Sequence, residues 1–293
     1  MELVFQSKDQ YLDAFIENGL LEDVGEGDHT SLACIPSDDR CRAKLFVKDA
    51  GVIAGIEVAR RIFQKVDPEA KFQEFLPDGA DVDYGEVAFE VECNTQALLK
   101  AERLVLNTMQ RMSGIATLSN RFAFEVEDLG AKILDTRKTT PMIRFLEKWA
   151  VRLGGCHNYR TGLYDWIMIK DNHIDECGGV GKAIERVAAY QKEKGLRLKV
   201  TVEVRNLVEL YEVLEVGGID RILLDNFELP LLEEAVAIVG KRFETEASGG
   251  ITIHNVRRVA QTGVDYISVG ALTHSAVSLD LSLKVIKEGQ DPG

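Results

Sequence analysis

The amino-acid sequence predicts an α/β protein in which a small mixed domain precedes an open, incomplete parallel α/β barrel. Short apolar runs recur after residue 131, and the last four begin at residues 199, 221, 243 and 265, a constant spacing of 22 residues. Repeated units of one strand and one helix build parallel sheets. Six runs fit into this part of the chain, whereas an eight-unit barrel usually takes about 250 residues. The barrel is therefore expected to be incomplete.

The first 112 residues combine the periodicities of helices and of strands. Apolar side chains at helical spacing predict helices over residues 8–22 and 55–66. Alternation of apolar and polar residues predicts strands over residues 42–48 and 86–92. These elements are expected to form a small domain whose sheet is covered by helices on one side.

The domain boundaries follow from two further helical patterns. A long pattern runs from Thr95 to about Met112 and is expected to complete an N-terminal domain over residues 1–112. The barrel then takes residues 113–274. A last helical pattern over 275–286 predicts a C-terminal helix, within 275–293, that returns to the first domain.

Six apolar runs predict the strands of the barrel. Runs that are almost continuously apolar fit a parallel sheet that is buried on both faces. The runs cover residues 132–134, 166–169, 199–202, 221–224, 243–246 and 265–269.

Composition excludes several classes of protein. The chain has 293 residues and a formal net charge of −13. This acidity argues against a general nucleic-acid binder and against docking on anionic lipid. No apolar stretch of about 18 residues predicts a membrane span. The first residues show no basic segment followed by an apolar run, so no secretory signal is expected.

Cysteine usage predicts a cytoplasmic protein with reduced thiols. The five cysteines are odd in number and scattered, which does not fit a disulfide framework. No Cys-x-x-Cys pair suggests a zinc site.

The charge is unevenly distributed along the chain. Residues 103–170 contain 11 Lys and Arg against 6 Asp and Glu, a net charge of +5, while the remainder carries −18. Local fields in a cleft steer small charged ligands more than the total charge does. A small anionic ligand therefore remains compatible with this acidic chain.

The residues that follow each apolar run are the candidate site residues, because parallel α/β folds bind ligands at the carboxyl ends of their strands. All six runs are followed by charged residues, hydroxyl-bearing residues or glycines. Six such ends around one rim indicate a ligand site more strongly than any single one. The candidates are Thr136, Arg137, Lys138, Lys170, Glu203, Asp225, Ser248, Gly249, Gly250 and Gly270.

Glycines follow the last two predicted strands, where barrels often bind a phosphate. Ser248-Gly249-Gly250 precedes a helix expected near Ile253, and Gly270 precedes another. Glycine lets backbone N–H groups approach a phosphate, and a helix N-terminus adds partial positive charge. The alternative is that both segments are ordinary loops.

Charged residues at the other strand ends suggest a metal and an anion. Glu203 and Asp225 end neighbouring strands, and Mg²⁺ usually binds through one or two carboxylates plus substrate phosphates. Arg137, Lys138 and Lys170 together suggest an anion pocket. The alternatives are structural hydrogen-bond acceptors for the carboxylates and solvated or ion-paired charges for the cations.

These residues and several further stretches resemble the quinolinate phosphoribosyltransferase family, the carboxylating nicotinate-nucleotide pyrophosphorylases. The resemblance covers nearly the whole chain, and the stretches are specific when taken together. The stretches comprise residues 22–23 together with 27–30, residues 102–107 with Glu102-Arg103-Leu104 and Asn107, and residues 113–117, 135–141, 170–173, 202–204, 224–227 and 248–250.

The resemblance implies an N-terminal α/β sandwich domain followed by an open α/β barrel. It implies a reaction that joins quinolinate to 5-phosphoribosyl 1-pyrophosphate, with nicotinate mononucleotide, pyrophosphate and CO2 as products. It also implies a requirement for Mg²⁺, a place in de novo NAD synthesis, and a homodimer or a higher oligomer.

Roles for individual residues also come from the resemblance. Arg137, Arg160 and Lys170 would contact the quinolinate carboxylates, with Arg103 reaching the pocket from the partner subunit. Thr136 and Tyr159 count among the expected substrate contacts, and the expected catalytic residues are Lys138, Lys170, Glu203 and Asp225. The residues expected to hold the sugar pyrophosphate and its metal are Lys138, Glu203, Asp225, Ser248, Gly249, Gly250 and Gly270, with Glu203 and Asp225 as metal ligands.

One position departs from the family pattern. Where the family commonly has Asn-His-Arg, this chain has Asn158-Tyr159-Arg160. Tyrosine donates a hydrogen bond but carries no positive charge at neutral pH, and His157 is an alternative source of an imidazole. Two other functions therefore stay open: transfer to a different heterocyclic acid, and binding of a sugar phosphate without catalysis.

Overall fold

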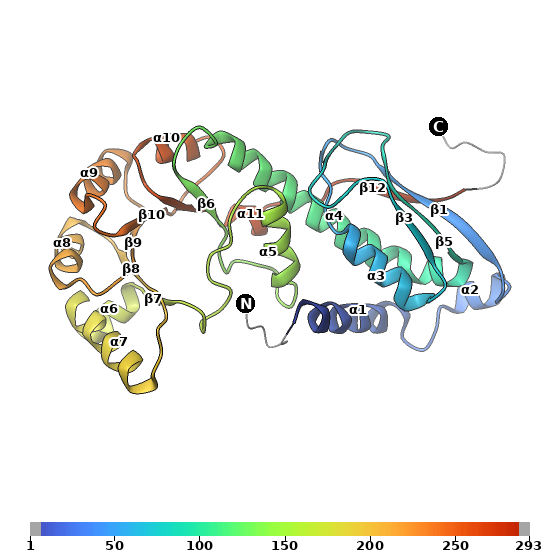
Figure 1. Cartoon of the computed structure of the whole chain (residues 1–293), viewed down its shortest axis with the longest axis horizontal. Helices are drawn as coiled ribbons and strands as arrows, with labels where there is room; N and C mark the ends of the chain where they lie inside the picture. Colours follow the sequence, from blue (N-terminus) through green and yellow to red (C-terminus); the bar gives the residue numbers. More distant parts are fainter. Residues whose placement is uncertain (1–6, 287–293) are drawn as a thin grey trace. The chain divides into compact units, whose positions relative to one another are not determined.

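The computed structural model describes residues 7–286, which divide into two compact units (Figure 1). Among the described residues, unit 1 comprises 7–120, 141–155 and 276–286, and unit 2 comprises 121–140 and 156–275. The division differs from the expected boundary after residue 112, because residues 113–120 and 141–155 belong to unit 1. Within the described residues, no helix is long and apolar enough to cross a membrane.

Unit 1 contains an antiparallel sheet of four strands in the order β12-β1-β5-β3. The predicted strands are confirmed as β1 (Arg40–Val47) and β5 (Val87–Asn94), and β3 (Lys71–Glu74) borders β5. A short separate ladder joins β2 (Gly51–Val52) to β4 (Asp81–Val82).

The predicted C-terminal helix is wrong for the described residues, because Leu281–Ile286 forms strand β12. This strand pairs antiparallel with β1, in a register that places Val285 opposite Ala43. The free edge of β1 offers unpaired N–H and C=O groups, and pairing with them outweighs a weak helical pattern. Residues 287–293 lie outside the described part of the chain.

Helices cover the sheet of unit 1. The predicted helices are confirmed as α1 (Lys8–Val24), α3 (Ile56–Val66) and α4 (Thr95–Glu125), the last of which extends well beyond Met112. Two short helices, α2 (His29–Cys34) and α5 (Arg144–Leu153), were not predicted. Phe63 of α3 packs edge-on against Phe89 of β5, with ring centroids 6.0 Å apart.

Unit 2 is an open parallel barrel. Its strands are β6 (Lys132–Leu134), β7 (Ile167–Ile169), β8 (Val200–Val204), β9 (Arg221–Asp225), β10 (Glu244–Ser248) and β11 (Tyr266–Ser268). All six predicted strands are confirmed, and their spatial order is β6-β11-β10-β9-β8-β7. β6 and β7 are the two ends of this order. On the side of β6 that faces away from β11, the described chain forms only an isolated bridge, between Leu134 and His157. The expected open barrel is confirmed.

Helices surround these strands on the outside (Figure 1). They are α6 (Asp171–Cys177), α7 (Val180–Lys194), α8 (Leu207–Val216), α9 (Leu229–Val239), α10 (Val256–Gln261) and α11 (Ala271–His274). Because every strand is parallel, all six carboxyl ends open on the same edge of the sheet.

Candidate active site

The carboxyl edge of the unit 2 sheet brings the predicted charged residues together in pairs. Lys170 follows β7 and its Nζ lies 2.5 Å from Glu203 Oε2 of β8. Asp225 ends β9 in register with Ser248 at the end of β10, and the Ser248 hydroxyl donates to Asp225 Oδ1 at 2.5 Å. Residues far apart in sequence thus meet where the strands end, as the sequence predicted.

Asp225 is held by neutral donors. Besides the Ser248 hydroxyl, Asn226 Nδ2 donates to its Oδ2 at 2.7 Å. Within residues 7–286, no lysine or arginine pairs with Asp225, in contrast to Glu203. Asp225 therefore keeps a negative charge that a cation can still bind, whereas the charge of Glu203 is already compensated by Lys170.

The Gly249-Gly250 turn needs glycine for steric reasons. Gly249 has φ +90° and Gly250 has φ +61°, in the left-handed region that glycine adopts without strain. A Cβ on Gly249 would lie 2.1 Å from Asn226 Oδ1. The turn thus lies directly against the residue that binds Asp225. Helix α10 begins at Val256 rather than near Ile253, so the expected helix N-terminus does not directly follow these glycines.

Lys138 lies over the second glycine segment. A Cβ on Gly270 would be 3.1 Å from Lys138 Cδ, so the glycine leaves room for the lysine side chain. The Thr273 hydroxyl donates to the Lys138 carbonyl at 2.8 Å, and Thr136 Oγ1 accepts from the Lys138 amide at 3.1 Å. The predicted residues Thr136, Lys138 and Gly270 therefore share one end of the barrel edge.

Arg137 and Arg160 are neighbouring cations, and neither forms an ion pair within the part of the chain that the structure describes, although Asp165 and Glu246 partly offset the charge of Arg160. Burial and the neighbouring Arg137 lower the pKa of Arg160. The Arg160 side chain donates to the Trp166 carbonyl at 3.3 Å. Two neighbouring cations repel each other, and an anion between them relieves that repulsion. The pair is therefore suited to bind a carboxylate or a phosphate.

Asp135 positions the segment that carries Arg160. Its carboxylate is fully buried and accepts from Asn158 Nδ2 at 2.6 Å and from the Tyr159 amide at 2.8 Å. The His157 carbonyl accepts from the Asp135 amide at 3.0 Å, which attaches the segment to the edge of β6. Sequence reasoning gave Asp135 no role, although its place directly after a strand was a usable signal.

The Tyr159 side chain points into the barrel. It is buried, and its hydroxyl shares a hydrogen bond of 2.7 Å with Thr201 Oγ1. Thr201 precedes Glu203 by two residues on β8, so this contact lies below the carboxyl edge. Burial and the nearby Glu246 raise the pKa of Tyr159, which keeps it a neutral phenol. His157, the alternative imidazole, is exposed.

Arg221 and two glutamates form an ion-pair cluster inside the barrel that sequence reasoning missed. Arg221 is 3 % exposed, and its guanidinium lies 3.0 Å from Glu246 Oε2 and 2.9 Å from Glu244 Oε2. Its Cζ also lies 3.7 Å from the ring centroid of Tyr266. Burial alone would lower the pKa of Arg221, but Glu246 and Glu244 hold it above its usual value. Charged residues at alternating strand positions were the signal for this cluster.

Arg103 lies on α4 in unit 1 and is exposed. It forms no ion pair within the described residues. Its proposed role in a partner subunit's site is therefore considered below as part of the proposed function.

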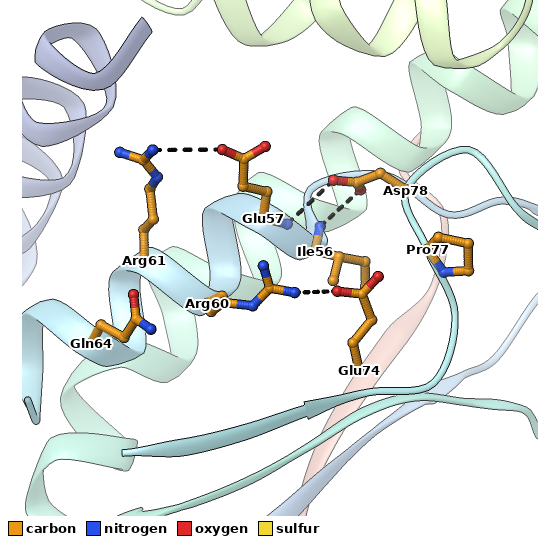
Figure 2. Close-up of a pocket in the computed structure, with 8 residues that line it drawn as sticks. All are labelled: Ile56, Glu57, Arg60, Arg61, Gln64, Glu74, Pro77 and Asp78. Carbon is orange, nitrogen blue, oxygen red and sulfur yellow. Dashed lines mark hydrogen bonds and ion pairs between the residues drawn. The ribbon is translucent and has the colours of Figure 1, made fainter. Parts of the chain in front are cut away.

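The cavity of about 500 Å³ in unit 1 is a weaker candidate for the site (Figure 2). It lies beside the N-terminus of α3, whose backbone amides are capped by Asp78. Arg60 pairs with Glu74, and Arg61 lies 3.6 Å from Glu57. Because its charges already pair with one another, the cavity offers less to an ionic ligand than the barrel edge does.

Metal binding at the barrel edge would depend on the substrate. Among residues 7–286, no group of three or more His, Cys, Asp or Glu side chains could hold a metal ion. Asp225, with lone pairs and no cationic partner, nevertheless fits Mg²⁺, which often takes only one or two protein carboxylates and completes its shell with phosphates and water.

Comparisons with known proteins agree with this architecture. Residues 115–284 match the family "Quinolinate phosphoribosyl transferase, C-terminal domain", and residues 28–113 match the corresponding N-terminal domain. The chain is 46 % identical over 292 residues to quinolinate phosphoribosyltransferase [decarboxylating] 1b of Nicotiana tabacum, covering 94 % of this chain and 83 % of that one. It is 40 % identical to a probable nicotinate-nucleotide pyrophosphorylase [carboxylating] of Bacillus subtilis, covering 94 % and 93 %.

A crystal structure shows the same fold. That of NadC from Streptococcus pyogenes superposes with a TM-score of 0.88 at 38 % identity, covering 94 % of this chain and 97 % of that one. The two family models together match residues 28–113 and 115–284, which is most of the chain. The chain belongs to the quinolinate phosphoribosyltransferase family.

Proposed function

We propose that this protein transfers the phosphoribosyl group of 5-phosphoribosyl 1-pyrophosphate to quinolinate with decarboxylation. The products are nicotinate mononucleotide, pyrophosphate and CO2, and the reaction belongs to de novo NAD biosynthesis. Its curated relatives carry the names of this enzyme. The observation that carries the proposal most directly is the carboxyl edge itself, where a cationic pair lies on the same rim as Asp225 and its glycine turn.

The cationic pair suits a pyridine dicarboxylate. Arg137 and Arg160 form no ion pair within the described chain, and guanidinium groups bind carboxylates bidentately. Lys170, which follows β7 and pairs with Glu203, would add a point charge. These side chains would hold the ring so that its nitrogen faces the sugar. Tyr159 would support this pocket from below through Arg160, its neighbour in the chain.

The other end of the rim suits the sugar pyrophosphate. The Gly249-Gly250 turn and Gly270 would offer backbone N–H groups to a phosphate, and the Lys138 side chain passes over Gly270. Asp225 would hold Mg²⁺, with Glu203 nearby, and the bound metal would supply positive charge to the leaving pyrophosphate.

The chain's own residues account for the rest of the chemistry. Lys138 would stabilise the negative charge that develops on the departing pyrophosphate. Glu203 would favour the positive charge that develops at the ribosyl carbon, while its ion pair with Lys170 keeps both side chains in place. Arg137 and Arg160 would hold the ring during loss of CO2 from the carbon beside the quaternised nitrogen. No acid–base dyad is required.

A stoichiometry assay tests the reaction. The purified protein, given quinolinate, sugar pyrophosphate and Mg²⁺, is expected to release pyrophosphate and CO2 in equal amounts. Nicotinate, which lacks the second carboxylate, is the matched control and is expected to release little pyrophosphate. Absence of activity with quinolinate would contradict the proposal and favour a different heterocyclic acid, and pyrophosphate without CO2 would indicate hydrolysis of the sugar pyrophosphate or transfer without decarboxylation.

We also propose that the active enzyme is a homodimer, or a higher oligomer built from such dimers, in which Arg103 enters the partner subunit's pocket. This follows the family resemblance and the exposure of Arg103, whose charge is unpaired within the described residues. Mixed chains test it, because a dimer of Arg103→Ala and Lys138→Ala subunits contains one site with both residues intact.

At full subunit exchange the mixture is expected to recover about one quarter of wild-type activity, since half of the dimers are mixed and each has one intact site. Each variant alone is the control. No recovery despite exchange verified by mass spectrometry would contradict a shared site.

A cytoplasmic location is proposed on the acidic composition and the odd, scattered cysteines. Relatives from plants carry "mitochondrial" or "chloroplastic" in their names. Fractionation of the source cells with activity measured in each fraction tests the location.

A further inference from the structure

Two cysteines of unit 1 lie directly opposite each other on neighbouring antiparallel strands. The register of β1 and β5 pairs Cys41 with Cys93. Directly opposed residues in such strands have Cα atoms about 4.5 or 5.5 Å apart, and disulfides span Cα separations of about 4.4–6.8 Å. The pKa of each thiol also depends on the other, which places the two side chains next to each other. The backbone therefore already holds them at bonding range.

The two thiols differ in exposure and in environment. Cys93 is fully buried, whereas Cys41 is partly exposed. The hydrogen bond from Cys93, with another from Thr95, lowers the pKa of Cys41 to about 6. Burial and Asp39 oppose this shift and Arg40 supports it. The lowered pKa favours the thiolate of Cys41, which is the reactive form of cysteine.

Cys93 is suited to react second. Its hydrogen bond with Cys41, burial and the nearby Asp67 raise its pKa, with Arg40 opposing, so that it stays a thiol until its neighbour is oxidised. An accessible low-pKa cysteine next to a second thiol is the arrangement found at redox-sensitive sites.

We propose that Cys41 and Cys93 form a peroxide-reactive dithiol site that closes reversibly into a disulfide between β1 and β5. This site is independent of the transferase reaction proposed above, because neither cysteine belongs to the barrel edge.

The chemistry balances with a hydroperoxide as the oxidant. The Cys41 thiolate attacks one peroxide oxygen, the O–O bond breaks, and the hydroxide that leaves is protonated to water. Cys41 is then a sulfenic acid. The Cys93 sulfur attacks the Cys41 sulfur, the S–O bond breaks and a second water leaves. Two thiols are oxidised by two electrons, hydrogen peroxide is reduced to two waters, and a dithiol reductant reverses the step.

The other three cysteines lack this arrangement. Cys34 and Cys177 lie in helices, and Cys156 is buried with its pKa raised to about 12 by burial and by Asp135. Cys34 is exposed and gives a matched accessible control within the same unit. Oxidation at low peroxide concentration should therefore be selective for the Cys41–Cys93 pair.

Peptide mapping of the full-length protein after treatment with hydrogen peroxide tests the site. The expected result is a Cys41–Cys93 cross-link that dithiothreitol removes, with Cys41 reacting about tenfold faster than Cys34 at pH 7. Iodoacetamide should alkylate Cys41 with a midpoint at clearly lower pH than that of Cys34 in the same sample. Two results would overturn the proposal. One is an alkylation midpoint at about pH 8.5, which is that of an ordinary thiol, and the other is oxidation without the cross-link.

Variants assign the order of the two steps. Cys93→Ser should stop at a Cys41 sulfenic acid that dimedone traps, and Cys41→Ser should abolish the cross-link, while Cys34→Ser should leave it unchanged. If Cys93→Ser folds poorly, Cys93→Ala takes its place in the experiment. The mapping of the wild-type chain needs no variant, so the proposal stays testable in either case.

Discussion

Replacing Arg221 by methionine is expected to lower the free energy of unfolding by about 3–5 kcal/mol, measured by urea denaturation at pH 7. Arg221 is buried in the barrel and its guanidinium contacts Glu244 and Glu246. Glu246 is fully buried. Methionine fills similar space but leaves this carboxylate without its cation, and an uncompensated buried charge is costly.

The pH dependence of this loss identifies its cause. Burial raises the pKa of Glu246 even in the wild type, against the hydrogen bond from Ser268 and the charge of Arg221. A carboxyl group with a raised folded-state pKa binds its proton more tightly in the folded state, so stability falls as pH rises. The deficit of Arg221→Met should therefore shrink when the pH is lowered from 7 towards 5.

Arg221→Met combined with Glu246→Gln is the matched control. The double variant removes both charges and should recover a substantial part of the stability lost in the single variant. Equal losses in the two variants, or a deficit that is independent of pH, would show that packing of Arg221 against the rings of Tyr159, Trp166 and Tyr266, rather than the buried charge, governs the effect.

Arg137→Ala is expected to raise the KM for quinolinate about 10- to 100-fold while the KM for the sugar pyrophosphate changes little. The estimate follows from the roughly 1.5–3 kcal/mol that a hydrogen bond to a charged group contributes. Arg137 faces Arg160 without a carboxylate partner within the described chain, so its removal should cost ligand binding rather than folding stability. Initial-rate kinetics with each substrate varied in turn measure the two constants.

Two variants control this experiment. Arg137→Lys keeps the positive charge but loses the bidentate geometry, so an intermediate loss is expected. Arg197→Ala removes an exposed arginine of the same unit that is not at the barrel edge, and it should leave both KM values unchanged. Equal weakening of both substrates by Arg137→Ala would contradict the assigned role.

Local patterns predicted most of the elements that position the site. The strands of unit 2 were recognised because their apolar runs repeat at constant spacing, and their carboxyl ends were recognised because polar residues follow each run. The ion pair of Lys170 with Glu203 and the hydrogen bond of Ser248 with Asp225 were not predicted. The order and register of the strands decide such contacts, and neither is written in the spacing of one segment.

Tyr159 shows the same limit within the site. The sequence indicates that a tyrosine stands where the family commonly has histidine, but not where its side chain points. Its amide binds Asp135 while its hydroxyl binds Thr201 inside the barrel. Two partners from distant strands therefore decide its orientation.

The amino-acid sequence was sufficient to predict the six strands of the barrel and the residues at their carboxyl ends, because burial periodicity and strand-end chemistry are local properties. The family followed from the resemblance of specific stretches of the chain. Only the tertiary structure decided that Leu281–Ile286 is a strand, since the free edge of β1 supplies its hydrogen-bond partners. It also decided that Arg221 and Cys41 meet their partners Glu246 and Cys93. Such pairings depend on which chain segments lie side by side, and packing across long sequence separations determines that arrangement.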